Sequence, residues 1–131
     1  MRWTAALLVL GVAAGCGGPS AAASCVGPTL AVAPAQARVG QEVVVTVDRL
    51  HEGCNDYTGA DEERALTDVP VGFVQDAVRV PLGTVSGTGD TFAAQLTVRV
   101  PAQATPGPAR VVVGNGSSDV EWLTAEFTVA P

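Results

Sequence analysis

The chain has 131 residues, 47% of them hydrophobic and 15% charged, which is the composition of a folded protein rather than a disordered one. Its length fits a single domain. Seven arginines and no lysine stand against 13 acidic residues, and the net charge is −6, so a nucleic-acid partner is not expected.

The first fifteen residues have the pattern of an export signal. Arg2 precedes the apolar run AALLVLGVAA at 5–14, which is too short to span a bilayer as a stable helix. The run leads to AAGC at 13–16, which resembles the lipobox of bacterial lipoproteins, with Ala13 at the position usually held by leucine. Residues 1–15 are therefore expected to be a lipoprotein signal peptide.

The lipobox resemblance implies a modification of Cys16. The chain would be cut before this residue, its thiol would carry a diacylglycerol group, and the new N-terminus would accept a further acyl chain such as palmitate. Two acyl chains give a stable anchor where one is marginal. The alternative is an ordinary secretory signal cut near Ala23, which would discard Cys16.

The segment after Cys16 is expected to be a tether. Residues 17–24, GGPSAAAS, are small and would form a flexible chain with a span of roughly 15 Å. The acidic balance of the chain argues against a second, polybasic contact with anionic lipids. The lipid alone is thus expected to hold the protein at the outer face of the cell membrane.

Residues 25–131 are expected to form the folded domain, and their pattern is that of strands. The predicted strands are 29–34, 42–50, 69–75, 78–85, 91–100, 108–115 and 124–130. Alternation between apolar and polar residues predicts which side chains face the core. These are Leu30, Val32, Val43, Val45, Val47, Phe92, Ala94, Leu96, Val98, Val100, Val111, Val113, Ala125, Phe127 and Val129.

The breaks between these runs carry turn residues. The segments 37–41, 86–90 and 114–118 are short and rich in glycine, and Asn115-Gly116 is typical of a two-residue type I′ hairpin turn. Pro81 predicts an edge strand or a bend. Residues 61–66 could form one helical turn. Seven short strands separated by such turns predict an all-β fold, a single β-sandwich with an immunoglobulin-like strand count.

Three motifs resemble those of bacterial immunoglobulin-like modules of cell-surface proteins. They are Pro34 followed by Val39-Gly40, the segment GDTF at 89–92 before a long alternating strand, and VPAQATPG at 100–107 after it. The resemblance covers most of residues 28–131 and implies the fold. Such folds host many functions, so the motifs alone name no activity.

Cys25 and Cys54 remain after lipidation of Cys16, and an even pair in an exported protein predicts a disulfide. If the first two strands form a hairpin turning at Val39-Gly40, the numbers of paired residues add up to about 79. This register places Cys25 opposite Cys54 and Val32 opposite Val47. The bridge is expected to stabilise the domain by roughly 3–4 kcal/mol.

The segment 51–68 is long for a sandwich loop and rich in acids. Its carboxylates Asp56, Asp61, Glu62 and Glu63 are weak candidates for a calcium site, because calcium takes six to eight oxygens, although their spacing is not that of an EF-hand loop. A solvated acidic loop is the alternative. His51, the only histidine, is expected to be a surface residue beside the disulfide, and no metal or other cofactor is expected.

Two aromatic residues are candidate contacts for a protein or glycan partner. Tyr57 lies in the acidic loop, and Trp122 has the parity of the outward face of the last strand, where a structural role is the alternative. No serine, histidine and acid are placed as in a catalytic triad, and no enzymatic activity is expected.

The sequence therefore predicts a lipid-anchored bacterial cell-surface protein that acts as a non-enzymatic binding module for an unknown ligand. The alternative is an accessory structural component of the cell envelope that docks on other envelope proteins.

Overall fold

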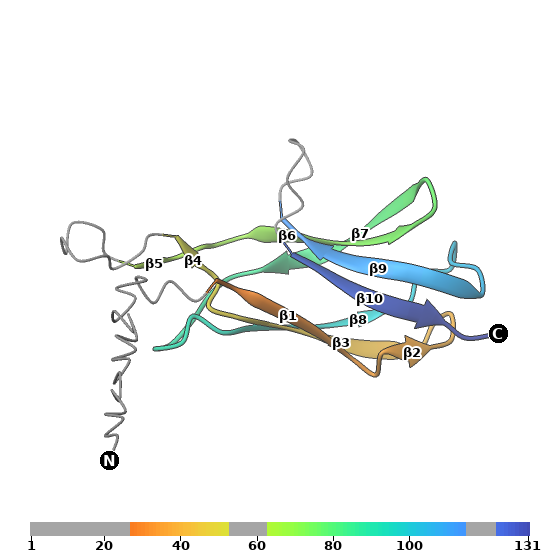
Figure 1. Ribbon diagram of the computed structural model, residues 1–131, viewed down its shortest axis with the longest axis horizontal. Helices are drawn as coiled ribbons and strands as arrows, with labels where there is room; N and C mark the ends of the chain where they lie inside the picture. The colour runs from red at the N-terminus through yellow and green to blue at the C-terminus, as the bar shows by residue number, and fades with distance from the viewer. Residues whose placement is uncertain (1–26, 53–62, 115–122) are drawn as a thin grey trace, which may run out of the picture.

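The computed structural model describes residues 27–52, 63–114 and 123–131. Within these ranges the regular elements are all strands, and the two larger sheets stack as a sandwich (Figure 1). The strands are β1 (Thr29–Ala33), β2 (Gln36–Ala37), β3 (Glu42–Asp48), β4 (His51–Glu52), β5 (Arg64–Ala65), β6 (Val69–Gln75), β7 (Val78–Val85), β8 (Ala94–Arg99), β9 (Gly107–Val113) and β10 (Leu123–Val129). The predicted all-β, sandwich-like fold is confirmed. None of the described segments contains a helix long and apolar enough to cross a membrane.

The first sheet consists of β1, β3 and β8, all antiparallel, with β3 in the centre. Val43, Val45 and Val47 of β3 are buried, whereas the residues between them are partly exposed. β8 repeats this alternation, since Ala94 and Val98 are buried. The predicted inward faces of both strands are confirmed, but β8 begins at Ala94 rather than at residue 91, because residues 89–92 form a turn.

The second sheet has the order β2-β10-β9-β6-β7. Its strands are antiparallel except for the two-residue β2, which runs parallel to β10. Both β6 and β7 have the predicted bounds, and a two-residue turn joins them. β7 is an edge strand of this sheet. Its register with β6 shifts at Pro81, since Val71 lies opposite Gly83 and Gly72 lies opposite Pro81. The edge strand predicted from Pro81 is therefore confirmed.

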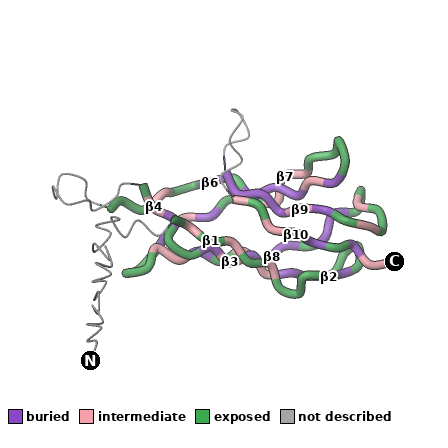
Figure 2. The backbone as a smooth tube through the Cα atoms, in the orientation of Figure 1, coloured by how far each residue is buried: buried purple, intermediate pink, exposed green. Residues whose placement is uncertain are grey.

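One hydrophobic core lies between the two sheets and accounts for most of the buried residues (Figure 2). Branched side chains dominate it because they pack well on a pleated surface. Phe73 of β6 and Phe127 of β10 meet edge to face, with ring centroids 6.5 Å apart. The largest fully buried side chains are Leu50, Val45, Val47, Val71, Val111, Val112, Val113 and Val129.

The path between β1 and β3 differs from the predicted hairpin. After β1 the chain crosses to the second sheet, where Gln36 and Ala37 pair with Thr128 and Val129 of β10, before it turns into β3. Val32 consequently lies opposite Val45, not Val47, and the numbers of paired residues add up to 77 instead of 79. The predicted register was wrong by two residues, because the connection is a change of sheet rather than a tight turn.

This shift removes the numerical argument that placed Cys25 opposite Cys54. Both cysteines, like Cys16, lie outside the described residues, so the disulfide remains a prediction from cysteine count and export.

The acidic loop differs from its prediction at the residues that the structure describes. His51 and Glu52 of β4 pair with Ala65 and Arg64 of β5, which makes a two-stranded sheet instead of a helical turn over 61–66. Glu52 and Arg64 also form an exposed ion pair at 4.0 Å. A pair of this kind contributes at most about 1 kcal/mol, so backbone pairing is the main link between the two segments.

The β9–β10 hairpin is longer than the sequence suggested. Val113 lies opposite Leu123, so nine residues (114–122) join the strands, not a two-residue turn at Asn115-Gly116. Residues 115–122 lie outside the described part of the chain. The regular register from Val113 back to Gly107 nevertheless confirms that β9 and β10 are adjacent antiparallel strands.

Gln75 fastens the connection between β8 and β9 to the body of the sandwich. It is 7% exposed, and it is the one buried polar side chain among the described residues. Its Nε2 donates to the Thr105 carbonyl oxygen at 2.7 Å, and its Oε1 accepts from the Thr105 backbone N–H at 2.9 Å. The Gln75 amide thus satisfies both backbone groups of Thr105, as a paired strand would do.

Candidate functional site

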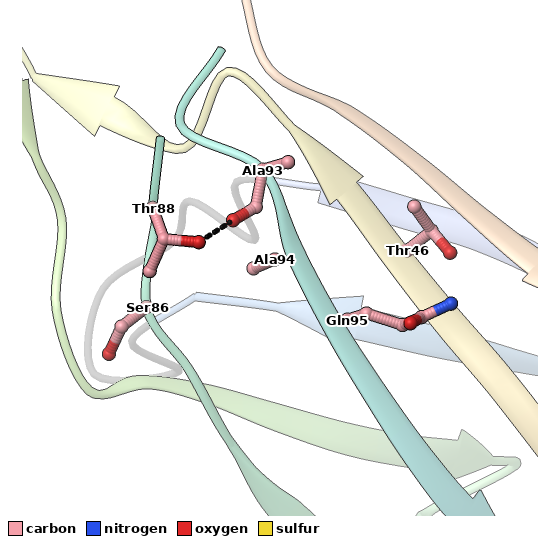
Figure 3. A pocket seen from close by; sticks show the side chains of 6 residues that line it. All are labelled: Thr46, Ser86, Thr88, Ala93, Ala94 and Gln95. Atoms are coloured by element: carbon pink, nitrogen blue, oxygen red, sulfur yellow. Dashed lines mark hydrogen bonds between the residues drawn. The ribbon is translucent and has the colours of Figure 1, made fainter. Parts of the chain in front are cut away.

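A hollow of about 500 Å³ opens beside the first sheet, near the start of β1, since its lining residue Thr46 lies opposite Ala31. Its lining residues are Thr46, Ser86, Thr88, Ala93, Ala94 and Gln95 (Figure 3). We call it the Thr46–Gln95 hollow. Thr46 of β3 and Gln95 of β8 are directly opposite in the sheet register, and both side chains point away from the core. The other wall is the segment that leads from β7 into β8.

The wall is shaped by a tight turn at residues 89–92. Thr88 and Ala93 close the turn with backbone hydrogen bonds of 2.9 Å in both directions. The Thr88 hydroxyl adds a third bond to the Ala93 carbonyl oxygen at 3.1 Å (Figure 3). Gly89 suits this turn because its φ is +70°, a value that glycine adopts without steric penalty. The turn therefore positions the hydroxyl of Thr88 at the rim of the hollow.

Residues with a left-handed backbone conformation lie in the segments around this hollow. Three residues other than glycine with positive φ, namely Arg49 (57°), Asp68 (52°) and Phe92 (51°), lie in the segments that support it. Each such conformation costs about 1 kcal/mol and persists where the surroundings hold it in place. Here Arg49 N–H donates to the Thr91 carbonyl oxygen at 3.0 Å, and Asp68 N–H donates to Ser86 Oγ at 2.9 Å.

Gly87 joins the hollow to the two-stranded sheet. Its N–H donates to the Leu66 carbonyl oxygen at 2.8 Å, and Leu66 N–H donates to the Leu50 carbonyl oxygen at 3.0 Å. A Cβ added at Gly87 would collide with that Leu50 oxygen and would lie 3.1 Å from the Phe92 oxygen. The segment can approach this closely only because residue 87 has no side chain.

The hollow offers neutral hydrogen-bonding groups. Thr46 contributes a hydroxyl that can donate and accept, and Gln95 contributes an amide. The Ser86 hydroxyl accepts from Asp68 N–H and can still donate, whereas the Thr88 hydroxyl donates to the Ala93 carbonyl oxygen and can only accept from a ligand. None of its six described lining residues is ionisable, so these six supply no general acid, general base or metal ligand of the carboxylate type. This chemistry suits a neutral ligand rich in hydroxyl or amide groups.

His51 occupies a different position from the one predicted. It is half-buried rather than on the surface, and its ring packs on Phe92 with centroids 4.9 Å apart. Its Nδ1 is buried and has no hydrogen-bond partner among the described residues. The histidine therefore contacts the turn at 89–92 through Phe92, and it is not one of the described residues that line the hollow.

Most of the residues singled out by the sequence lie outside the described ranges. These are Cys16, Cys25, Cys54, Asp56, Tyr57, Asp61, Glu62 and Trp122. Glu63 is described and exposed, directly before β5. In the part of the chain that the structure describes, no three histidine, cysteine or acidic residues gather as a metal site.

The residues of the Thr46–Gln95 hollow were not predicted as a site. Thr46 lies between Val45 and Val47, which were predicted to face the core, so alternation places it on the outward face. The glycine-rich segment 86–90 was predicted as a turn. The missing information was tertiary, because nothing in the sequence shows that residues 86–88 lie beside β3 and β8.

The chain matches no protein-family model, no curated protein and no solved structure.

Proposed function

We propose that the protein is a lipid-anchored bacterial cell-surface protein whose sandwich is an immunoglobulin-like, non-enzymatic binding module. The anchor rests on AAGC at 13–16 after an apolar run of signal-peptide length. The binding role rests on the Thr46–Gln95 hollow, which is the single structural observation that carries it. The proposed site of action is the outer face of the cell membrane.

The strand order supports the immunoglobulin-like type. β1, β3 and β8 take the places of strands A, B and E, and β10, β9, β6 and β7 take those of G, F, C and C′. β2 continues the first strand on the opposite sheet, beside β10. The motifs that resemble immunoglobulin-like modules lie where this order needs turns, since residues 39–40 precede β3 and residues 89–92 precede β8.

The proposed ligand is neutral and rich in hydroxyl groups, such as a glycan. Sugar hydroxyls can both donate and accept, so they match the hydroxyls of Thr46 and Ser86, the amide of Gln95 and the accepting oxygen of Thr88. A charged ligand would leave its charge without a counter-charge in this lining, which is unfavourable where water is displaced.

The first prediction concerns the anchor. Changing Cys16 to alanine removes the thiol that carries the lipid, so the protein should move from the membrane pellet to the soluble fraction or the medium. Fractionation of cells that express the full chain, followed by immunoblotting, measures this. Ser24→Ala in the tether is the control, because it leaves Cys16 and the predicted Cys25–Cys54 disulfide unchanged, and it should stay with the membranes. Equal membrane retention of Cys16→Ala would rule out the lipid anchor.

The second prediction concerns the hollow. Thr46→Arg places a long charged side chain in the hollow and should reduce glycan binding at least tenfold, whereas Thr128→Arg on the outer face of the second sheet should not. The measurement is binding of the purified full chain to a glycan array.

Array binding that is the same for both variants would exclude the hollow as the site. A stoichiometric protein complex recovered from detergent-solubilised membranes, with no glycan bound by the wild type, would favour the alternative role as a structural envelope component.

A further inference from the structure

A second hollow lies between the edge strands β7 and β8. Its volume is about 440 Å³, which is within the usual range for ligand pockets. Residues 80–82 of β7, residues 97–99 of β8, and Pro101 and Gln103 after β8 line it. β7 is an edge of the second sheet and β8 is an edge of the first, so this hollow opens on the flank of the sandwich. We call it the Pro81–Gln103 hollow.

The lining of this second hollow combines apolar surface with neutral hydrogen-bonding groups. Pro81, Leu82 and Pro101 supply apolar surface. Thr97 supplies a hydroxyl and Gln103 an amide, and both residues are exposed. These two groups can donate and accept hydrogen bonds, as the polar groups of a sugar do. The apolar surface suits the C–H faces of a sugar ring, because covering it removes it from water.

The second hollow has no net charge to attract an ion. Arg99 is the one ionisable residue among its described lining residues. The Arg99 guanidinium is paired with Glu42 Oε1 at 3.2 Å, and it also donates to the Gly40 carbonyl oxygen at 3.0 Å. It has five N–H groups in all, so donors remain for a neutral acceptor. The two hollows therefore favour the same class of ligand.

β8 connects the two hollows. Gln95 lines the Thr46–Gln95 hollow, and Thr97 lines the Pro81–Gln103 hollow. Residues two apart on a strand face the same side, about 7 Å from each other, so both side chains lie on the outer side of β8. At this point β7 contributes Gly83, which lies beside Leu96 and has no side chain that would separate the hollows.

An extended peptide fits this flank less well than a glycan. A peptide strand would need free backbone groups along β8, but Thr88 forms a β-bridge with Ala93, directly before this strand. Residues 86 and 88 also line the hollow beside Gln95. A ligand that spans both hollows must therefore bind to side chains, which is how hydroxyl groups of a glycan are recognised.

We propose that the two hollows are subsites of one groove, which binds a neutral oligosaccharide along β8. This groove rests on the glycan-binding function proposed above and extends it from a single sugar unit to a chain. One unit occupies the Thr46–Gln95 hollow, and the chain continues past Thr97 to the apolar surface of Pro81 and Leu82. Linked units bind more tightly than single ones, because the second unit is held at a high effective concentration.

The dependence of affinity on glycan length tests the groove. Calorimetry of the full chain, in a detergent without a sugar headgroup, compares monosaccharides with their longer oligomers. The probes are the oligomers of glucose, N-acetylglucosamine and mannose. In the series that binds, affinity should rise at least tenfold from the single sugar to the longer chains and then level off. Equal affinity for the monosaccharide and its oligomers would overturn the groove and leave a single-hollow site.

A substitution in the second hollow separates the two subsites. Thr97→Arg places a long charged side chain there, so it should lower oligosaccharide affinity at least tenfold and leave monosaccharide affinity unchanged. Thr128→Arg, the same change on the outer face of the other sheet, is the matched control and should alter neither. Gln103→Leu, at an exposed loop position, should lower oligosaccharide affinity severalfold by removing a hydrogen-bonding group.

The outcomes distinguish the groove from the function on which it rests. Oligosaccharide binding that neither Thr97→Arg nor Gln103→Leu weakens would overturn the groove, while the role of the Thr46–Gln95 hollow would stand. A wild type that binds no member of the three series and no glycan on an array would overturn both the groove and the proposed glycan ligand.

Discussion

Replacing Gly87 by alanine is expected to destabilise the domain by about 3 kcal/mol, since overpacked positions that cannot relax lie at the upper end of the usual range. The new methyl group would meet the Leu50 carbonyl oxygen, a backbone atom that is itself bonded to Leu66 N–H. Relief requires movement of the segment 86–93 away from β4 and β5. Urea denaturation of the full chain, followed by circular dichroism, measures the change.

Gly27→Ala is the control for this substitution. No described residue lies within 4 Å of a Cβ at Gly27, so the change should alter the free energy of unfolding by less than about 0.5 kcal/mol. Equal stability of the Gly87 and Gly27 variants would show that the approach between Gly87 and Leu50 is not required for the fold. The Gly87 variant is also expected to lose the shape of the Thr46–Gln95 hollow, because residues 86 and 88 line it.

Replacing Gln75 by leucine is expected to cost about 3 kcal/mol. The change removes the partners of the Thr105 N–H and carbonyl oxygen, and each unsatisfied polar group in a part-buried setting costs about 1–3 kcal/mol. The Pro108 carbonyl oxygen, which accepts from Gln75 Nε2 at 3.4 Å, also loses a contact. Because domains are commonly stable by only 5–15 kcal/mol, the loss should be large in thermal denaturation.

Gln103→Leu is the matched control for the Gln75 substitution. Gln103 lies in the same connection between β8 and β9 but is exposed. Its replacement should change the free energy of unfolding by less than about 0.5 kcal/mol. If the two leucine variants unfold at the same temperature, the amide of Gln75 does not hold this connection, and the loop must be fixed by its prolines.

The inward faces of the strands could be predicted because a strand has a period of two. Val43, Val45 and Val47 alternate with polar or less buried residues, and one face of β3 is packed against the core. The same rule placed Phe127 and Val129 correctly in β10. The predicted bounds of β6 and β7 were also correct, because only residues 76–77 separate the two strands.

The change of sheet after β1 could not be predicted by the same rule. Alternation shows which face of a strand is buried, but it does not show which partner the strand has. β2 is fixed by its pairing with Thr128 and Val129, which lie at the other end of the sequence. A local hairpin was the simplest expectation, and it gave the correct parity with a register error of two residues.

The outer face of the second sheet shows a second limit of alternation. Val111 and Val113 face the core, so Val112 should be outside, yet it is 1% exposed. Arg79 Nε and Val112 Cγ2 lie 3.5 Å and 3.3 Å from the position that a Cβ at Gly72 would take. Gly72 thus leaves room for the Arg79 side chain to lie beside Val112, a tertiary contact that no local pattern contains.

The candidate site could not be predicted from the sequence for a related reason. Thr46 and Gln95 could be placed on outward faces, but their hollow also needs Ser86 and Thr88 from a separate segment. Threonine and serine in turns and on exposed faces are common and carry no signal of a site on their own. The hollow exists because β3 pairs with β8 and because Gly87 lets the segment 86–88 approach the backbone of Leu50 and Phe92 closely.

The mass of the intact protein purified from bacterial membranes tests the proposed identity most directly. The account predicts the mass of residues 16–131 plus a diacylglycerol group and its further acyl chain, less two hydrogens for the Cys25–Cys54 disulfide. A mass that corresponds to a chain cut near Ala23, without lipid, would contradict the anchor and, with it, the proposed place of this protein at the cell surface.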